Sequence, residues 1–197
     1  MIKFFDIDDS KPYDVFKQKY SEAFKLNQPA IEAICISSIA NAKEVDSRFV
    51  NLKMIKEDKW IFFSNYESEK AMQFEKNNNI SAIFYWNVIN TQIRIKATIH
   101  KMPKDFNKDY FETRKKEKNA LAISSRQSKR VDSFEDVNTA YLNAMQNKDL
   151  TKCPDYWGGF SFIPSYFEFW EGHKNRLNRR MVFQYNGKKW DKYLLQP

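Results

Sequence analysis

The final stretch of the chain holds the side chains best suited to bind a small anion. Phe167–Gly172 reads Phe-Glu-Phe-Trp-Glu-Gly and brings Trp170 close in sequence to a group of cations. Four cations lie within seven consecutive residues, namely Lys174, Arg176, Arg179 and Arg180. Guanidinium groups bind carboxylate and phosphate oxygens in pairs, and they also stack on flat rings. The segment therefore predicts a site for a small, flat, anionic molecule.

Glycine is scarce, which excludes several kinds of phosphate-binding loop. The chain has 4 glycines, at Gly158, Gly159, Gly172 and Gly187. A Walker loop, a dinucleotide-binding turn and a Gly-x-Ser-x-Gly nucleophile elbow all need glycine where the backbone turns tightly or approaches a phosphate. Any phosphate must therefore be held by side chains, and arginine and lysine are the suited residues.

Residues for metal binding or for a catalytic triad are also scarce. The histidines are His100 and His173, the cysteines are Cys35 and Cys153, and none has the local spacing of a metal site. We therefore expect no metal, no Ser-His-Asp triad and no disulfide framework. With no signal-peptide pattern and no apolar run of about 20 residues, we expect a cytoplasmic protein without membrane contact.

The formal charge of +8 raises the alternative of a nucleic-acid partner. The 33 Lys and Arg residues are spread along the chain, however, and 25 Asp and Glu residues are interspersed with them. This pattern is typical of a solvated basic surface, so nucleic acid is not the expected partner.

The hydrophobic pattern predicts a single domain over residues 1–197 that is mainly β, in the α+β class. Helices are expected over 11–26, over 67–77 and, in three pieces, over 104–145. Strands are expected over 30–39, 48–55, 60–64, 80–86, 92–100, 160–163, 166–170, 181–185 and 189–195. Asn186-Gly187 predicts a hairpin turn, and an aromatic content of 16% predicts a core of packed rings. Short antiparallel strands with inserted helices favour a barrel.

Six blocks of sequence, in order, resemble the pyridoxamine 5'-phosphate oxidase family. The C-terminal block is Glu168-Phe169-Trp170-Glu171-Gly172 followed by Arg176-Leu177-Asn178-Arg179-Arg180, where the family has E-F-W-x-G and R-L-H-D-R. The other blocks are Arg48–Lys53, Phe63–Ala71, Gln92–Ile95, Gln127-Ser128 and Trp157–Phe160. Each block alone is weak, but their joint order over most of the chain is specific.

The resemblance implies an FMN-binding split β-barrel with peripheral helices. It implies a homodimer with flavin at the subunit interface, in which the segment 153–197 completes the barrel and the active site. The implied reaction oxidises pyridoxine or pyridoxamine 5'-phosphate to pyridoxal 5'-phosphate. The flavin takes a hydride from the substrate, and dioxygen is reduced to hydrogen peroxide.

The resemblance also implies roles for individual residues. The residues implied to bind FMN are Arg48, Phe49, Val50, Asn51, Leu52, Lys53, Phe63, Ser64, Lys70, Gln92, Gln127, Ser128, Trp170 and Arg180. The residues implied to bind the substrate are Lys53, Tyr110, Arg114, Lys118, Arg176 and Asn178. Among these, Arg176 and Asn178 are the implied catalytic pair.

Three positions depart from the family pattern. Glu69 stands where the family usually has an arginine that contacts the FMN phosphate, and a carboxylate there repels a phosphate. Lys118 stands where a serine normally touches the substrate phosphate, and Asn178 replaces a histidine. Asparagine forms hydrogen bonds but does not exchange a proton near neutral pH.

Two alternative functions remain open, and the altered positions Lys118 and Asn178 bear on the first of them. One is a flavin oxidase of the same fold that acts on another substrate, as in phenazine biosynthesis. The other is a non-catalytic binder of flavin, of pyridoxal phosphate or of nucleic acid.

Overall fold

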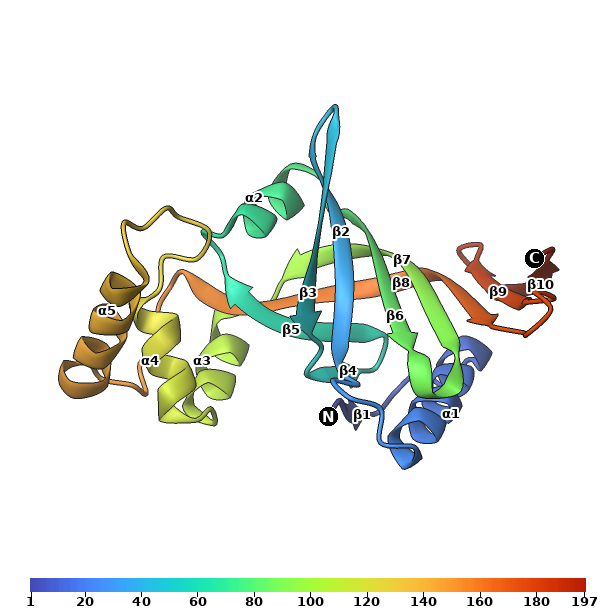
Figure 1. The fold of residues 1–197 in the computed structure, drawn as a ribbon, viewed down its shortest axis with the longest axis horizontal. Helices are drawn as coiled ribbons and strands as arrows, with labels where there is room; N and C mark the ends of the chain where they lie inside the picture. Colours follow the sequence, from blue (N-terminus) through green and yellow to red (C-terminus); the bar gives the residue numbers. More distant parts are fainter.

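The computed structural model describes all 197 residues, and it contains 5 α-helices and a 10-stranded sheet (Figure 1). The helices are α1 (Lys11–Lys25), α2 (Glu69–Lys76), α3 (Lys104–Glu112), α4 (Lys116–Ser124) and α5 (Phe134–Asn147). The strands are β1 (Lys3–Phe5), β2 (Ala33–Asn41), β3 (Glu44–Asn51), β4 (Met54–Lys56), β5 (Lys59–Asn65), β6 (Asn79–Trp86), β7 (Thr91–Lys101), β8 (Trp157–Glu171), β9 (Arg179–Tyr185) and β10 (Trp190–Leu195). A short 3-10 turn, η1 (Asn87–Ile89), joins β6 to β7.

Strand β8 is the spine of the sheet, because it pairs with three other strands. Along one edge it pairs with β7 over most of its length. Along the other edge its first half pairs with β5 and its second half pairs with β9. The remaining order runs β1-β4-β5-β8-β7-β6-β2-β3, and β10 continues the sheet beyond β9.

The core is built largely from aromatic rings, as the composition predicts. Helix α1 turns Tyr13, Phe16 and Tyr20 inward, and the rings of Phe16 and Trp60 lie 4.5 Å apart between centroids. Trp86 lies 5.6 Å from the same phenylalanine ring. Burying rings of this size is among the larger favourable contributions to folding. The amphipathic spacing of α1 therefore places one face of this helix, with its rings, in the core.

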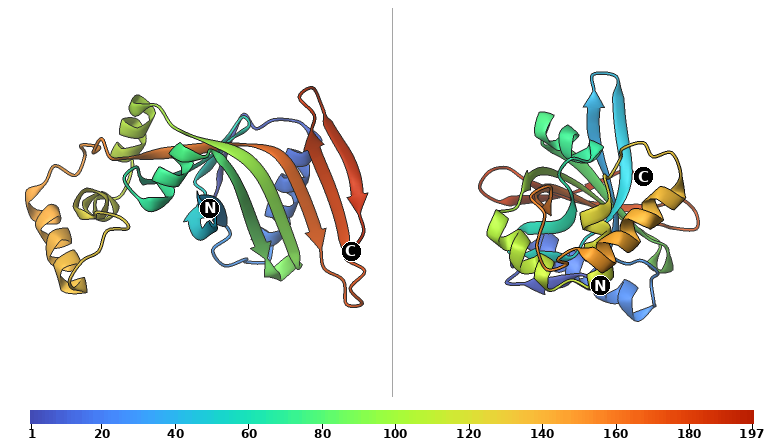
Figure 2. Two further views of the ribbon diagram at one scale, coloured as in Figure 1. Left: turned by 90° about the horizontal axis from the view of Figure 1, so that it is seen from above. Right: turned by 90° about the vertical axis from the view of Figure 1, so that its left-hand side faces the viewer.

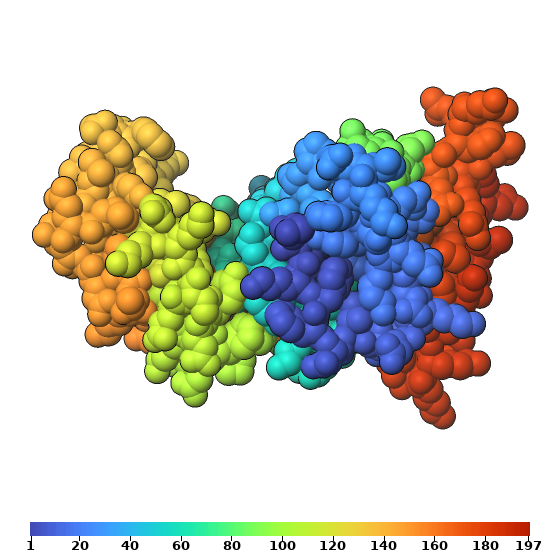
Figure 3. All heavy atoms as spheres, turned by 90° about the horizontal axis from the view of Figure 1, so that it is seen from below, coloured from blue at the N-terminus to red at the C-terminus, as the bar shows by residue number.

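The two ends of the molecule are built from different segments. Helices α3, α4 and α5 lie at one end of the long axis, while β9 and β10 lie at the other, and a view turned by 90° agrees (Figure 2, left). Seen from below, the surface is hollowed between the yellow-to-orange helical region and the blue and cyan N-terminal part (Figure 3). No helix has both the length and the apolar character needed to span a membrane.

The expected elements are mostly found, although several strands begin or end at other residues than expected. The strand expected over 48–55 breaks at Leu52–Lys53, because the chain leaves its partner β2 and joins β5 and β1. The strands expected over 160–163 and 166–170 form one strand, since β7 pairs across the whole stretch with one irregularity opposite Pro164. Strand β1 was not expected at all, and it is only three residues long.

Gly158 marks the tightest packing in β8. A Cβ atom at this position would overlap the Tyr66 hydroxyl and the carboxamide of Asn107. Those groups are fixed, since Asn107 Nδ2 donates to Tyr66 Oη at 2.8 Å and Asn107 Oδ1 accepts from Gly159 N at 2.8 Å. The glycine therefore leaves room for a polar network that joins α3 to the sheet.

We expect Gly158→Ala to destabilise the protein by about 1–3 kcal/mol, the usual cost of overpacking. Chemical denaturation measures the change in the free energy of unfolding. Ser165→Ala, at an exposed position of the same strand, serves as the control and should leave the free energy unchanged. Equal stability of the two variants would contradict the packing argument.

Candidate functional site

Lys70 is a buried cation without a carboxylate partner. Its side chain is only 8% exposed, and Nζ lies 3.4 Å from both Ser64 Oγ and Ser68 Oγ. Burial, and next the positive charge of Arg48, hold the pKa of Lys70 below its ordinary value. A buried charge normally has a counter-ion, since taking an ammonium group out of water is costly. The first turn of α2 and the end of β5 therefore form a site prepared for an anion.

Arg48 lies beside this site but is held by protein groups. One terminal nitrogen donates to Ser38 Oγ at 2.6 Å, and the other donates to Gln73 Oε1 at 2.8 Å. Burial lowers the pKa of Arg48, while the carboxylates of Asp46 and Glu69 act in the opposite direction. Sequence reasoning missed Gln73, whose amide orients this guanidinium from α2. Its only sequence signal is the position of a polar residue on the buried face of an amphipathic helix.

Gln127 ties the loop after α4 to the same corner. Its Oε1 atom accepts hydrogen bonds from Ser64 Oγ at 3.1 Å and from the backbone N–H of Asn65 at 3.2 Å. The neighbouring Ser128 is exposed and has a φ of 70°, in the left-handed region. The structure therefore brings together Ser64, Lys70 and Gln127, three of the residues that the resemblance implies for FMN binding.

Flat groups are stacked beside an adjoining cavity, and Phe63, Trp157 and Arg114 among them line it. The rings of Phe63 and Tyr110 are nearly parallel and 3.8 Å apart between centroids, and Trp157 lies 5.1 Å from Phe63 on a parallel plane. The Arg114 guanidinium sits over Trp157 at 4.3 Å. The cavity has a volume of about 320 Å³, and Lys118 and Gln127 also line it.

Arg114 and Lys118 line this cavity, and Lys53 lies near enough for their charges to act on it. Burial lowers the pKa of Lys53; Glu32 opposes this effect, and Lys118 and Arg114 lower the pKa further. The Nη1 atom of Arg114 is buried and has no hydrogen-bond partner within the protein. Mutually repelling cations with an unsatisfied donor are suited to hold a second anion.

Side chains along β3 point alternately to the two faces of the sheet, so the residues implied to bind FMN around Arg48 do not all lie on one face. Leu52 is wholly buried in the core, and Val50 is half-buried and packs against that core. Phe49 and Asn51 point to the opposite face, where Phe49 is 74% exposed. The structure does not bring the side chains of Phe49, Asn51 or Leu52 into contact with Lys70.

The remaining predicted residues gather at the far end of β8. Gln92, Trp170 and Arg180 lie opposite one another on β7, β8 and β9. Arg176 is exposed with a φ of 60°, in the loop that joins β8 to β9. Asn178 Oδ1 accepts a hydrogen bond from the backbone N–H of His173 at 3.0 Å, so this carboxamide closes the loop.

The two halves of the predicted site do not meet within one chain. Trp157 borders the cavity and Trp170 lies beside Arg180, and thirteen residue steps of extended strand between them span about 43 Å. Figure 1 shows the corresponding elements at opposite ends of the molecule. A single chain therefore cannot present all of the predicted residues to one small ligand.

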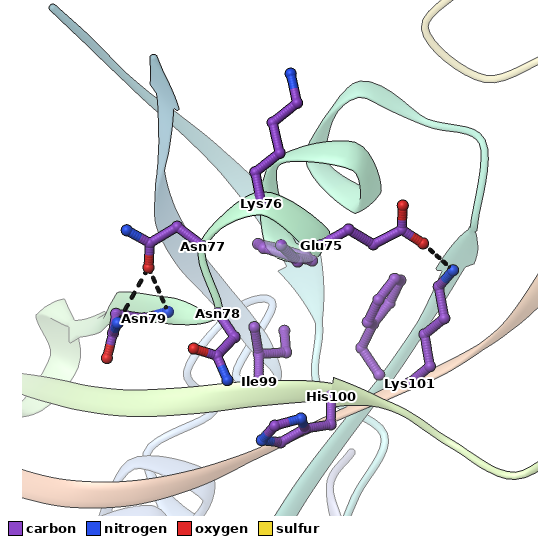
Figure 4. A pocket seen from close by; sticks show the side chains of 10 residues that line it. Glu75, Lys76, Asn77, Asn78, Asn79, Ile99, His100 and Lys101 are labelled. Atoms are coloured by element: carbon purple, nitrogen blue, oxygen red, sulfur yellow. Dashed lines mark hydrogen bonds and ion pairs between the residues drawn. The ribbon is translucent and has the colours of Figure 1, made fainter. Parts of the chain in front are cut away.

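A larger groove lies outside the predicted residues. It has a volume of about 610 Å³ and lies between the end of α2 and β7 (Figure 4). Its charged Lys101 is paired with Glu75, and Asn77 Oδ1 accepts bonds from the backbone and side chain of Asn79. Because these polar groups satisfy one another, the groove lacks the unpaired buried charge that distinguishes Lys70.

Comparison with solved structures identifies the class of fold. PhzG from Burkholderia lata 383, solved in complex with tetrahydrophenazine-1-carboxylic acid, superposes with a TM-score of 0.90 at 21% identity and covers 95% of this chain and 93% of its own. A pyridoxamine 5'-phosphate oxidase-related, FMN binding protein from Nostoc punctiforme gives a TM-score of 0.76 at 12% identity, covering 95% of this chain and 98% of its own. The fold is thus the split β-barrel of this class, as predicted.

Comparison of sequences identifies the family. Residues 17–138 match the family described as Pyridoxamine 5'-phosphate oxidase, and residues 157–197 match the Pyridoxine 5'-phosphate oxidase C-terminal dimerisation region. The pyridoxine/pyridoxamine 5'-phosphate oxidase of Leptospira interrogans is 30% identical over 192 residues, which cover 95% of this chain and 89% of the relative. That of Colwellia psychrerythraea is 32% identical, covering 96% and 88%. The chain belongs to the pyridoxamine 5'-phosphate oxidase family, a family of oxidoreductases.

We expect Lys70→Met to stabilise the ligand-free protein by about 1–3 kcal/mol, because it removes a buried charge that lacks a partner. The lowered pKa gives this effect a pH dependence. Above the folded-state pKa of Lys70 and below its unfolded-state pKa, the unfolded chain binds more protons, so wild-type stability rises with pH.

Thermal unfolding across the alkaline range in phosphate-free buffer tests this expectation. The difference in melting temperature between Lys70→Met and the wild type should become smaller as the pH rises. Lys76→Met, at an exposed position of the same helix, is the control and should change neither the midpoint nor its pH dependence. A Lys70→Met protein that melts below the wild type would refute the idea of an uncompensated cation.

Proposed function

We propose that this protein is an FMN-dependent oxidase that converts pyridoxamine or pyridoxine 5'-phosphate to pyridoxal 5'-phosphate and reduces dioxygen to hydrogen peroxide. The observation that carries the proposal is the presence of two adjacent cation sites whose lysines and arginine form no salt bridge with a carboxylate. One is Lys70 with its hydroxyl partners, and the other is the group of Lys53, Arg114 and Lys118. Cofactor and substrate in this reaction each carry one phosphate.

The residues present fit an FMN phosphate at the first site. The Lys70 ammonium supplies the charge, and Ser64 and Gln127 supply hydrogen-bonding groups beside it. Arg48 adds positive potential from behind, held in place by Gln73. Gln92, Trp170 and Arg180 would line the flavin ring. When bound, FMN supplies the hydride acceptor and passes the electrons on to dioxygen.

Glu69 weakens this site without blocking it. Its side chain is exposed, so water screens much of its repulsion of a phosphate. Its charge still acts on both Arg48 and Lys70, since it favours the protonated form of each. We infer that FMN binds here with lower affinity than in relatives with an arginine at this position.

The second site would hold the phosphate of the substrate. Lys53, Arg114 and Lys118 provide the charge, and the unsatisfied Nη1 of Arg114 provides a donor. Phe63 and Trp157 supply apolar lining on one side of the cavity, and the Tyr110 ring stacks on Phe63. Arg176 would cover the pyridine ring. Asn178 would hold the loop that presents Arg176, since its carboxamide already closes that loop.

The site would be completed by a second copy of the chain. Phosphate-binding residues lie at one end of β8 and ring-binding residues at the other, and residues 157–197 match a dimerisation region. The outer sheet face also exposes apolar rings, with Phe49 at 74% and Tyr85 at 58%. We propose a homodimer in which residues 153–197 of each chain, within a single domain of residues 1–197, complete the active site of the other.

A second candidate function is an oxidase of the same fold with another substrate. It is favoured by the TM-score of 0.90 to PhzG, which was solved with tetrahydrophenazine-1-carboxylic acid. That ligand carries a carboxylate and no phosphate. The three-cation group at Lys53 favours a phosphate, because a dianion makes fuller use of three positive charges than a carboxylate does.

We expect the purified protein to be yellow or to become yellow on addition of FMN. Pyridoxamine 5'-phosphate and oxygen should then yield pyridoxal 5'-phosphate and peroxide, measured by absorbance and by a coupled peroxidase assay. A protein that stays colourless and binds no FMN would rule out the flavoenzyme. Flavin-loaded protein that is inert toward both phosphorylated vitamers but oxidises a dihydro-aromatic carboxylate would favour the second candidate.

We expect Lys70→Met and Arg176→Ala to be inactive alone and to complement each other when co-refolded. A mixed dimer has one site with both lesions and one with neither, so roughly a quarter of wild-type activity should return. A mixture of Lys70→Met and Arg114→Ala is the control. Both lesions lie at the same end of the chain, so each site keeps one of them and no activity returns. Equal results from the two mixtures would show that each site is formed by one chain.

A further inference from the structure

Glu168 is the most deeply buried carboxylate of the chain, and three strands supply its partners. It is 1% exposed. Its Oε1 accepts from Arg180 Nε at 2.8 Å, and its Oε2 accepts from Arg94 Nη1 at 2.9 Å and from Tyr166 Oη at 3.0 Å. These donors come from β9, β7 and β8 respectively.

Glu168 is ionised at neutral pH despite its burial. Burial would raise its pKa, but the hydrogen bonds from Arg180 and Tyr166 and the charge of Arg94 outweigh burial and hold the pKa below its ordinary value. The same carboxylate contributes to raising the pKa of Tyr166 to about 12, where burial is the largest cause. The group is therefore a fixed negative charge between two guanidinium groups.

The orientation of Arg180 is determined by two partners on different segments. Nε is held by Glu168, and Nη1 donates to the backbone carbonyl of Gln196 at 3.0 Å. Arginine carries five N–H donors, so Nη2 and the outer edge of the guanidinium remain free. The Arg180 guanidinium is therefore held in one orientation and keeps N–H donors that can bind a ligand.

Arg180 projects from the sheet face where the flavin ring is proposed to bind. Residues directly opposite in neighbouring strands project to the same face, and so do residues two apart in one strand. Arg180 pairs with Trp170, and Trp170 pairs with Gln92. Glu168 precedes Trp170 by two residues and therefore lies on this face too.

We propose that Glu168 is the positioning residue that holds Arg180 in the orientation required for contact with the flavin ring. It does so without touching the ligand itself. This inference rests on the proposed function, since it takes Arg180 to be a flavin contact. If Glu168 only linked β7, β8 and β9, it would stabilise the fold. Its substitution would then change ligand affinity independently of a substitution at Arg180.

A double-mutant cycle on FMN affinity in the full-length protein separates these roles. Glu168→Gln and Arg180→Lys should each raise the Kd for FMN by about tenfold or more, the expected loss for a charge-assisted interaction. Because Glu168 acts through Arg180, the double variant should bind FMN no more than about threefold more weakly than Arg180→Lys alone. Fluorescence quenching of free FMN measures each Kd, and thermal unfolding of the apo-protein checks the fold.

Glu171→Gln is the matched control. Glu171 lies three residues further along β8, where it pairs with Lys19 at 2.9 Å and Arg179 at 3.7 Å and has no bond to Arg180. This variant should leave the Kd within about twofold of the wild type. A large effect from Glu171→Gln would show that the affinity responds to any loss of charge from this strand, which overturns the proposal.

Glu168→Asp keeps the test decisive if Glu168→Gln does not fold. It retains the charge but shortens the side chain by one methylene, so it cannot reach Arg94 and Arg180 together, and Kd should rise at least fivefold. A wild-type Kd for FMN in Glu168→Gln or Glu168→Asp would overturn the positioning role of Glu168 and leave the proposed function standing. So would a double variant in which the effects of Glu168→Gln and Arg180→Lys on Kd multiply. Wild-type protein that binds no FMN would instead overturn the proposed function and this inference with it.

Discussion

The structure depends on one constraint, which is that a single strand of fifteen residues pairs with three others. Strand β8 joins β5 to β7 in its first half and β9 to β7 in its second half. Its hydrogen bonds therefore fix the barrel, the C-terminal hairpin and the distance between them. Trp157 at its start borders one cavity, and Trp170 near its end borders the other group of site residues. Neither group can move toward the other without breaking the sheet.

The two ends handle buried charge in opposite ways. At the first end, Lys70 has only hydroxyl groups as hydrogen-bond partners, and no carboxylate of the chain forms a salt bridge with it. At the second end, Glu168 is fully paired with protein donors, and the surplus positive charge is carried by an arginine with a free edge. The first arrangement sacrifices stability for binding, while the second gives a fixed geometry.

The three departures from the family pattern have different structural meanings. Glu69 is exposed beside a cation site, and it reduces the positive potential there. Lys118 joins Lys53 and Arg114, and it increases the positive potential around the second cavity. Asn178 uses its carboxamide oxygen to close the loop before β9, so its role within the chain is to shape that loop. Glu69 and Lys118 thus alter the charge of the candidate site, and Asn178 affects the conformation of the loop before β9.

Much of this molecule follows from the sequence alone, because periodicity and turn residues are local properties. The spacing of Phe16 and Tyr20 determined α1, alternation determined most strands, and the order of six motifs determined the family. The lack of early glycines determined that any phosphate would be held by side chains. Tertiary structure alone decided which residues meet. The break at Leu52–Lys53, the support of Arg48 by Gln73 and the burial of Glu168 all depend on partners far away in sequence. The separation of the Lys70 and Arg180 ends of the candidate site has the same origin. It arises because β5 and β9 pair with different halves of the same edge of β8. Which strands pair with each other cannot be read from the local sequence.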